Sequence, residues 1–264
     1  MESKAGWGVG WVMLFSLVCL GLALLAGPEL PWPSYHPSPP RSPEQWRQER
    51  TKLSSGLRDL RVQFSNQTRP AWTLVAASLK APMQPLPDYP AVLLLLVGTE
   101  AALPTADCLA SRLVRLSSAG LAPAPPGLVP PPASQLTIEA ALLPQTDEGA
   151  AKAELTQELH RLLGTWGAAG ISSLHLLAPA PALTLHAFAD NSNAPYKQAA
   201  LVATLVAGPG AEPGCQLERR AEAALSAVWA EQLGQDKLAA LLSRLVVSVA
   251  EVNQESAETL SAIC

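Results

Sequence analysis

The most informative chemical feature of the sequence is a strand-to-helix joint that lacks the residues needed to grip phosphate. The apolar run AVLLLLV at 91–97 ends at Gly98, and a helical pattern follows. A nucleotide-binding loop at such a joint needs a second glycine and then Lys-Ser/Thr, which hold phosphate and magnesium. The stretch from Gly98 to Thr105 has neither, and Glu100 would repel phosphate. We therefore expect no nucleotide hydrolysis by this chain.

Other catalytic sets are incomplete as well. A hydrolytic NTPase needs two acids after a later strand, whereas 183–190 offers only Asp190, followed by Asn191. The sequence has no Gly-x-Ser-x-Gly elbow and no Asp-x-Asp motif for a nucleotide-sugar metal site. The remaining titratable candidates are expected to be packed or solvated groups: His160, His175, His186 and the pair Asp147-Glu148.

The cysteines and histidines do not form a metal-binding pattern. No pair of them has a partner pair at zinc-ligand spacing, so we expect no metal and no cofactor. Cys19 lies within an apolar run, which leaves Cys108, Cys215 and Cys264. Three thiols allow at most one intramolecular disulfide, so this is not a disulfide scaffold.

An unbroken apolar run at 6–27 dominates the N-terminus. As a helix it would be roughly 33 Å long, enough to cross a bilayer once. Lys4 in the short tail 1–5 favours a cytoplasmic N-terminus, which makes the chain a single-pass type II membrane protein with its C-terminal bulk in the lumen. The alternative is a signal peptide cleaved after Ala26. The sequon at Asn66 is an N-glycosylation acceptor, usable only in the secretory lumen.

Composition indicates how the remaining chain is organised and which partners it excludes. Residues 28–43 hold seven of the 25 prolines and predict an extended stem, and 44–264 is long enough for one domain. The net charge is −4 and only 15% of residues are charged, so there is no basic footprint for nucleic acid.

Strand and helix patterns alternate along this domain. Ser42, Pro43 and Gln45 together predict a capped helix start, and an apolar stripe from Trp46 to Phe64 follows. Further strands are expected at 91–97, 136–142, 173–177, 183–189 and 199–207, and helices at 104–118, 152–163 (ended by Gly164), 216–233 and 236–246, with a loop at 120–134. Such alternation predicts an α/β three-layer domain with a mostly parallel sheet.

This order of elements, with its inactive nucleotide loop, resembles the lumenal domain of the torsin-interacting proteins of the lamina-associated polypeptide type. The resemblance covers Trp46 to the terminus. Four stretches carry it: Leu96-Val97-Gly98 with Asp107-Cys108-Leu109, Phe188 to Lys197 running into Ala200-Leu201-Val202, Leu242-Ser243-Arg244-Leu245, and the terminal Cys264.

The resemblance implies a degenerate AAA+-like (RecA-like) fold in a protein of the endoplasmic reticulum and nuclear envelope. Family members dock on a torsin, a lumenal AAA+ ATPase, and supply an arginine finger in trans. That residue corresponds to Arg244, which lies about 120° from the apolar stripe of its helix and should be free to reach another protein.

Two departures from the family pattern change the expectations. The terminal cysteine normally pairs with one just before the Asp190 turn, but Ala189 stands there, so Cys264 is free or pairs with Cys108 or Cys215. The long nucleoplasmic region is absent, so lamin binding is not expected.

The sequence leaves two rival functions open. One is a type II lumenal enzyme of glycosyltransferase-like topology, and the other is a secreted glycoprotein if the apolar segment is cleaved.

Overall fold

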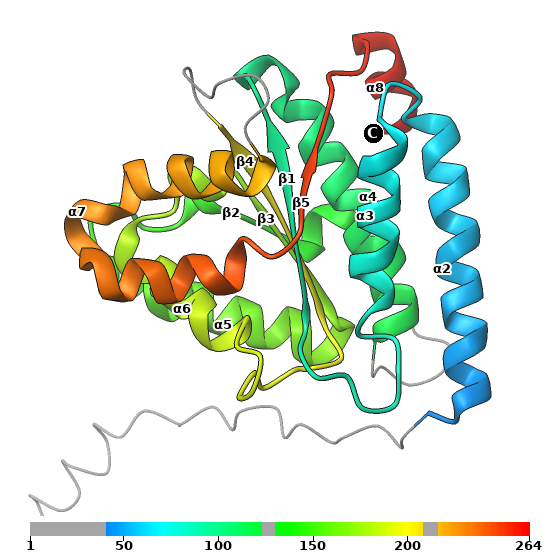
Figure 1. Ribbon diagram of the computed structural model, residues 1–264, viewed down its shortest axis with the longest axis horizontal. Coiled ribbons are helices and arrows are strands. Elements are labelled where there is room, and N and C mark those ends of the chain that lie inside the picture. The colour runs from blue at the N-terminus through cyan, green and yellow to red at the C-terminus, as the bar shows by residue number, and fades with distance from the viewer. Residues whose placement is uncertain (1–40, 123–129, 208–215) are drawn as a thin grey trace, which may run out of the picture. The chain divides into compact units, whose positions relative to one another are not determined.

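A computed structural model describes residues 41–122, 130–207 and 216–264, which form three layers. A five-stranded sheet lies between two helical layers, with α2, α3 and α4 on one side and α5, α6 and α7 on the other (Figure 1). Every strand pairing in the sheet is parallel. The predicted α/β class with a parallel sheet is confirmed.

The sheet has the strand order β2-β3-β4-β1-β5. Strands β1 and β4, which pair with each other in its interior, are the longest and are wholly buried, as continuous apolar runs covered on both faces should be. Their register aligns Ala91 with Ala200 and Val97 with Val206. The strands are β1 (Ala91–Val97), β2 (Thr137–Glu139), β3 (Ala168–Ser172), β4 (Ala200–Val206) and β5 (Val249–Glu251).

Helix α2 (Pro43–Gln63) begins where the sequence predicts. The hydroxyl of Ser42 accepts from the Gln45 N–H, and the Gln45 side chain accepts from the Ser42 N–H, which completes the capping box. The apolar stripe from Trp46 to Phe64 is buried. Gly56 lets α2 approach α4 (Leu103–Leu121), since a Cβ there would collide with Leu116. The glycine therefore serves packing between the two helices.

A helix that we did not predict follows directly. Helix α3 (Arg69–Lys80) is capped by the Thr68 hydroxyl, which accepts from the Ala71 N–H. Its buried side chains include Trp72, Val75 and Leu79, spaced three and four apart. Capping residue and spacing were both visible in the sequence, so this helix was predictable.

Helix α5 (Glu148–Trp166) is longer than predicted, and it does not end at Gly164. Gly164 is an interior position, where a Cβ would lie 3.2 Å from the Tyr196 hydroxyl. The helix ends at Gly167, which has a φ of 64° and leaves no room for a side chain beside Leu121. Gly167 is thus the true C-terminal stop.

Two predicted strands are wrong. Residues 173–177 hold a short 3₁₀ helix, Leu174–Leu176, and 183–189 belongs to α6 (Pro179–Phe188). Pro179 and Pro181 lie in the first turn of α6, where no backbone donor is needed. The strand in this part of the sheet is β3, five residues earlier than expected.

The C-terminal part returns to the sheet. Helix α7 (Leu217–Leu245) is kinked at Gly234, whose φ is 72°, so it behaves as the two predicted helices. After β5, the short helix α8 (Ala257–Ile263) ends the chain. Of the strand predicted at 136–142, only β2 is a strand, and it lies within a longer irregular segment. Helix α4 extends into the loop expected at 120–134, and residues 123–129 of that loop are outside the described residues.

None of the helices within the described ranges is long and apolar enough to cross a membrane. The tail 1–5, the run at 6–27 and the stem up to residue 40 lie outside those ranges.

Candidate functional site

The joint after β1 is where an α/β protein of this kind would hold a nucleotide, because ligands bind at the carboxyl ends of parallel strands. Here Gly98 leads into a 3₁₀ turn, Glu100–Ala102, and then into α4. Thr105 is fully buried, and its hydroxyl accepts a hydrogen bond of 3.0 Å from the Glu255 N–H. The hydroxyl at the start of α4 is therefore hydrogen-bonded to the C-terminal segment of the same chain.

A second internal contact lies beside the same glycine. Arg220, in the first turn of α7, places its Nη2 3.7 Å from the position of a Cβ on Gly98. Its Nη1 donates to Glu251 Oε1 at 2.7 Å, at the end of β5. The guanidinium of Arg220, which lies beside the glycine of this joint, is thus paired with a carboxylate of its own chain.

A polar group joins the ends of β3 and β4 to α4. The Ser173 N–H donates to the Thr204 hydroxyl at 2.8 Å, and this hydroxyl donates to Asp107 Oδ1 at 2.6 Å. Burial raises the pKa of Asp107, partly offset by the hydrogen bond from Thr204. Ser173 adopts a left-handed conformation with φ of 53°. The bond to Thr204 stabilises this turn.

His175 lies close to that group. Its Nε2 is 3.8 Å from Glu100 Oε1, and burial lowers the pKa of the imidazole. Within the described ranges, no hydrogen bond links the Ser173 hydroxyl, the His175 ring and the Asp107 carboxyl. These three groups therefore do not form the hydrogen-bonded chain that activates a nucleophile.

The turn between α2 and α3 is bonded to the segment after β5. Glu255 is buried, and its Oε1 accepts from the Asn66 N–H and from Gln67 Nε2, each at 2.9 Å. Asn66 itself is exposed, and its Nδ2 donates to the Gln254 carbonyl. The predicted glycosylation acceptor is therefore at the surface, with its amide nitrogen in a hydrogen bond.

A disulfide bond joins Cys108, on α4, to the terminal Cys264, with 6.0 Å between the Cα atoms. This decides between the partners that the sequence left open for Cys264. The alternative partner, Cys215, lies outside the described residues, as does Cys19. Because Cys108 is three residues after Thr105 on one helix, the bridge and the Glu255 contact hold the same C-terminal segment on α4.

Arg244 is not the free side chain that its position in the sequence predicts. Its Nε donates to Asp190 Oδ2 at 3.0 Å, and its Nη1 donates to the Ala240 carbonyl at 2.9 Å. The side chain remains 28% exposed, against 12% for that of Asp190. The expectation of a free guanidinium is therefore wrong: it is bonded to a carboxylate of its own chain. Periodicity placed Arg244 on the flank of α7 but could not show that the turn after α6 reaches it.

Asp190 is the residue that receives most of the local hydrogen bonds. Its Oδ1 accepts from the N–H groups of Asn193 at 2.7 Å and Ser192 at 2.8 Å. The bond from Asn193, then that from Arg244, then that from Ser192 lower the pKa of Asp190 to about 2. Asp190 is thus more than an isolated turn residue, because it joins the end of α6 to the end of α7.

The shifted pKa predicts how Asp190→Asn changes the pH dependence of stability. A carboxyl with a depressed folded-state pKa stabilises the fold above its unfolded pKa of about 3.9. That contribution is lost as the pH falls toward 2. We expect the variant to unfold more easily than the wild type at pH 7, and the difference to shrink between pH 4 and pH 2. Urea unfolding at pH 7, 4 and 2 measures it, and a difference that stays constant over this range would contradict the assignment.

Several of these contacts could not be predicted from the sequence. Asp107 and Thr204 are 97 positions apart, and Thr105 and Glu255 are 150 apart. No local pattern relates them, and only the parallel sheet brings them together. Across the described ranges, no group of three His, Cys, Asp or Glu side chains could hold a metal ion.

Comparison with known proteins adds little to this geometry. No protein-family model matches the sequence, and no curated protein does. Among solved structures, the fold is similar to a chain in the closed-state cryo-EM reconstruction of Hsp104 with ATPγS and FITC casein, at a TM-score of 0.48 and 12% identity. The alignment covers 78% of this chain but only 36% of that one.

Proposed function

We propose that this chain is a non-catalytic cofactor that binds an ATP-loaded torsin ATPase and stimulates hydrolysis by supplying Arg244 in trans. The observation that supports the proposal is that the Arg244 side chain, although its Nε is bonded to Asp190, is still partly exposed. Among the described residues, Nη2 makes no hydrogen bond. An arginine finger acts through such outer nitrogens, which stabilise negative charge on the transferred phosphoryl group.

The contact with Asp190 has to be part of this proposal. A neighbouring carboxylate offsets some of the positive charge that a phosphate would meet, which argues against a finger that simply projects from the surface. Asp190 also fixes the direction of the guanidinium, and a side chain held in place loses less conformational freedom on docking. We therefore propose that Asp190 positions Arg244 rather than neutralises it.

The absence of an active nucleotide loop in this chain supports a role in trans. Pro104 precedes the buried Thr105 in place of lysine, and the Thr105 hydroxyl is bonded to Glu255. Arg220, beside Gly98, is paired with Glu251. An AAA+-like domain in this condition can contribute to ATP hydrolysis only at the active site of a neighbour. An AAA+-like origin of the sheet is part of the proposal.

The proposed cellular setting follows from the apolar run at 6–27. We propose a single-pass type II protein of the endoplasmic reticulum membrane and nuclear envelope, with the described domain in the lumen. A torsin and this membrane are its proposed partners, without nucleic acid or lamins. The sequon at Asn66 is compatible with that orientation because its side chain is exposed.

The test is a measurement of phosphate release by a torsin, with and without the full chain in detergent micelles. We expect hydrolysis well above the sum of the two separate rates. The proposal is wrong if the mixture hydrolyses ATP only at that summed rate, measured at concentrations at which the two proteins co-purify with trapped ATP.

A second prediction concerns nucleotide binding by the chain itself. A ligand at 100 times its dissociation constant stabilises a protein by about 2.7 kcal/mol. Because Thr105 and Arg220 are already bonded within the chain, we expect millimolar MgATP to leave its unfolding temperature unchanged. Thermal unfolding with MgATP and with MgCl₂ alone measures this, and a shift of several degrees specific to ATP would contradict the prediction.

A further inference from the structure

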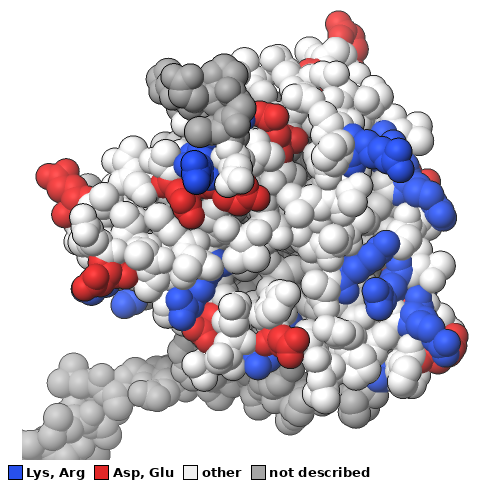
Figure 2. Space-filling view, in the orientation of Figure 1, with Lys and Arg blue, Asp and Glu red and all other residues white. Residues whose placement is uncertain are grey.

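Positive charge is concentrated on one helical pair of an otherwise acidic protein. Residues 41–81 contain eight Lys or Arg against three Asp or Glu, although the whole chain has a net charge of −4. This segment comprises α2 and α3, which lie side by side on the outside of one helical layer (Figure 1). Figure 2 shows lysine and arginine along this part of the surface, with few acidic residues among them. The low overall charge therefore conceals a strongly basic region.

The arginines of α2 share one side of the helix. At 100° per residue, they fall within an arc of about 80°, on the flank of the buried stripe. Arg69 and Lys80 occupy the two ends of α3. We call this set the basic face: Arg47, Arg50, Arg58, Arg61, Arg69 and Lys80.

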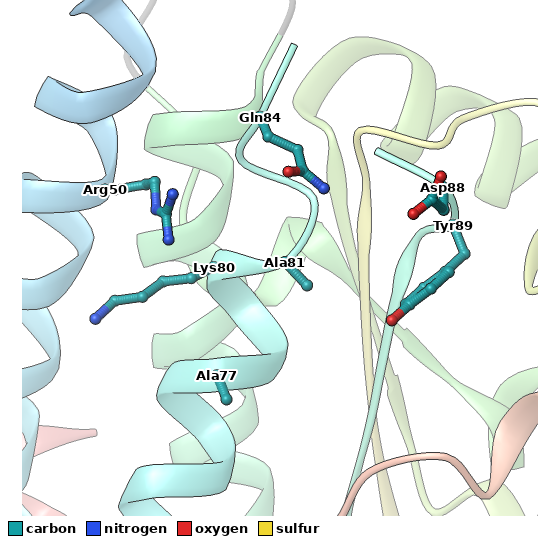
Figure 3. Close-up of a pocket in the computed structure, with 7 residues that line it drawn as sticks. All are labelled: Arg50, Ala77, Lys80, Ala81, Gln84, Asp88 and Tyr89. Atoms are coloured by element: carbon teal, nitrogen blue, oxygen red, sulfur yellow. The ribbon is translucent and has the colours of Figure 1, made fainter. Parts of the chain in front are cut away.

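The two helices bring their cations together at one end of this face. Arg50 from α2 and Lys80 from α3 line a shallow pocket of about 260 Å³, whose lining also includes Asp88 from the loop before β1 (Figure 3). In that view each of the two side chains extends toward the other helix. Two like charges that converge in this way repel each other unless an anion lies between or above them.

Few carboxylates of the described chain neutralise this face. Arg47 pairs with Glu44, but the other five members have no ion pair among the described residues. Arg47 and Arg50, and likewise Arg58 and Arg61, are like charges three residues apart, a spacing that destabilises an isolated helix. An external anionic surface would turn this repulsion into attraction.

Two exposed apolar side chains accompany the basic face. Val62, next to Arg61, is 79% exposed, and Leu86, in the loop after α3, is 89% exposed. Basic residues combined with exposed apolar ones are typical of surfaces that lie on a bilayer, where cations meet headgroups and apolar groups enter the acyl boundary.

The length of the chain before α2 indicates which anionic partner lies against the basic face. Only residues 28–42 separate the apolar run at 6–27 from the start of α2. Extended as the predicted proline-rich stem, 15 residues reach roughly 46 Å. If 6–27 crosses a membrane, the stem tethers the basic face within that reach of the headgroups of the same membrane, whereas nucleic acid or an acidic protein has no such tether.

We infer that the basic face lies on the anionic lipid headgroups of the membrane that holds residues 6–27. The inference rests on that anchor and is independent of the torsin proposal and of Arg244. Each lysine or arginine near an anionic bilayer strengthens its attraction by on the order of fivefold, an effect that salt screens.

The experiment uses the full chain in nanodiscs of phosphatidylcholine alone or with 30% phosphatidylserine. A water-soluble amine-reactive ester labels lysines, and mass spectrometry reports the labelling of Lys80, with the exposed Lys152 as an internal reference. We expect phosphatidylserine to slow labelling of Lys80 at least threefold relative to Lys152, and 0.5 M NaCl to remove the difference.

Two matched variants assign the effect to the basic face. Arg50→Glu/Arg58→Glu/Arg61→Glu should abolish the protection of Lys80 by phosphatidylserine. A control with the same change in charge, Lys152→Glu/Arg219→Glu/Lys237→Glu, replaces exposed residues outside this face and should keep the protection of Lys80. Because this control lacks Lys152, labelling of Lys80 is there expressed relative to the total amount of protein.

Three results of the labelling experiment overturn the inference. They are equal labelling of Lys80 in both lipids, protection that survives the Arg50/Arg58/Arg61 reversal, and protection that follows the number of chains per disc rather than the lipid. The last would place a second copy of the chain on this face. Failure of the chain to enter nanodiscs would also refute it, while leaving stimulation of a torsin open to its own test.

Discussion

Replacing Arg244 with alanine should reduce the torsin's rate of ATP hydrolysis to the level without this chain. A finger arginine contributes roughly 10³ to 10⁵-fold in other NTPases, so this is the largest functional effect we expect. Arg244→Lys should also fail to stimulate, because a compact ammonium group lacks the planar fork that bonds Asp190 through Nε and leaves the outer nitrogens for phosphate. Phosphate release under saturating torsin measures both variants.

Two further variants separate a finger from a merely structural arginine. Arg58→Ala removes an exposed arginine of α2 and should leave stimulation intact. Asp190→Asn keeps an oxygen that can accept from Arg244 Nε, so it should retain more activity than Asp190→Ala if Asp190 positions the guanidinium. Full stimulation by Arg244→Ala, or greater stimulation by Asp190→Ala than by the wild type, would contradict the proposed roles.

Replacing Cys264 with serine should produce the largest loss of stability among surface substitutions. The bridge to Cys108 joins residues separated by 156 positions, and closing so long a loop restricts the unfolded chain strongly. We expect a loss of about 2–4 kcal/mol. For a domain of this size, that corresponds to a fall in Tm of about 5–15 °C. Thermal unfolding of the full chain under non-reducing conditions measures the change.

The other cysteines provide the controls for this experiment. Cys108→Ser should match Cys264→Ser, and the double variant should be no worse than either, because all three lack the same bond. Cys215→Ser should behave as the wild type. If reductant lowers the Tm of Cys264→Ser as much as that of the wild type, the bridge between Cys108 and Cys264 is refuted.

Buried strands and amphipathic helices with clear caps were predictable. The strand at 91–97 and the start of α2 at Pro43 appear as expected, because a continuous apolar run and a capping box are local signals. The segment 183–189 was mistaken for a strand, since a short apolar run has no distinct period. Pro179 and Pro181, just before this segment, marked a helix start, and packing of α6 against α5 and α7 decided the outcome.

The candidate site was predictable only in part. The missing phosphate grip after Gly98 and the flank position of Arg244 follow from motif and helical period alone. The bond between Arg244 and Asp190 does not, because the two residues are 54 positions apart and meet only after α6 and α7 pack together. The same holds for the partner of Cys264, for which the sequence left two cysteines open.

The sequence by itself determined the fold class, the lack of a phosphate-binding loop and the presence of an apolar segment long enough for a membrane. Each of these depends on neighbouring residues, whose periodicity and spacing are written along the chain. Only the tertiary structure decided that Glu255 meets Thr105, that Cys264 meets Cys108, and that Arg244 is bonded to its own molecule. Such contacts depend on the parallel order of the strands and on the packing of helices across the sheet, and no local pattern encodes them.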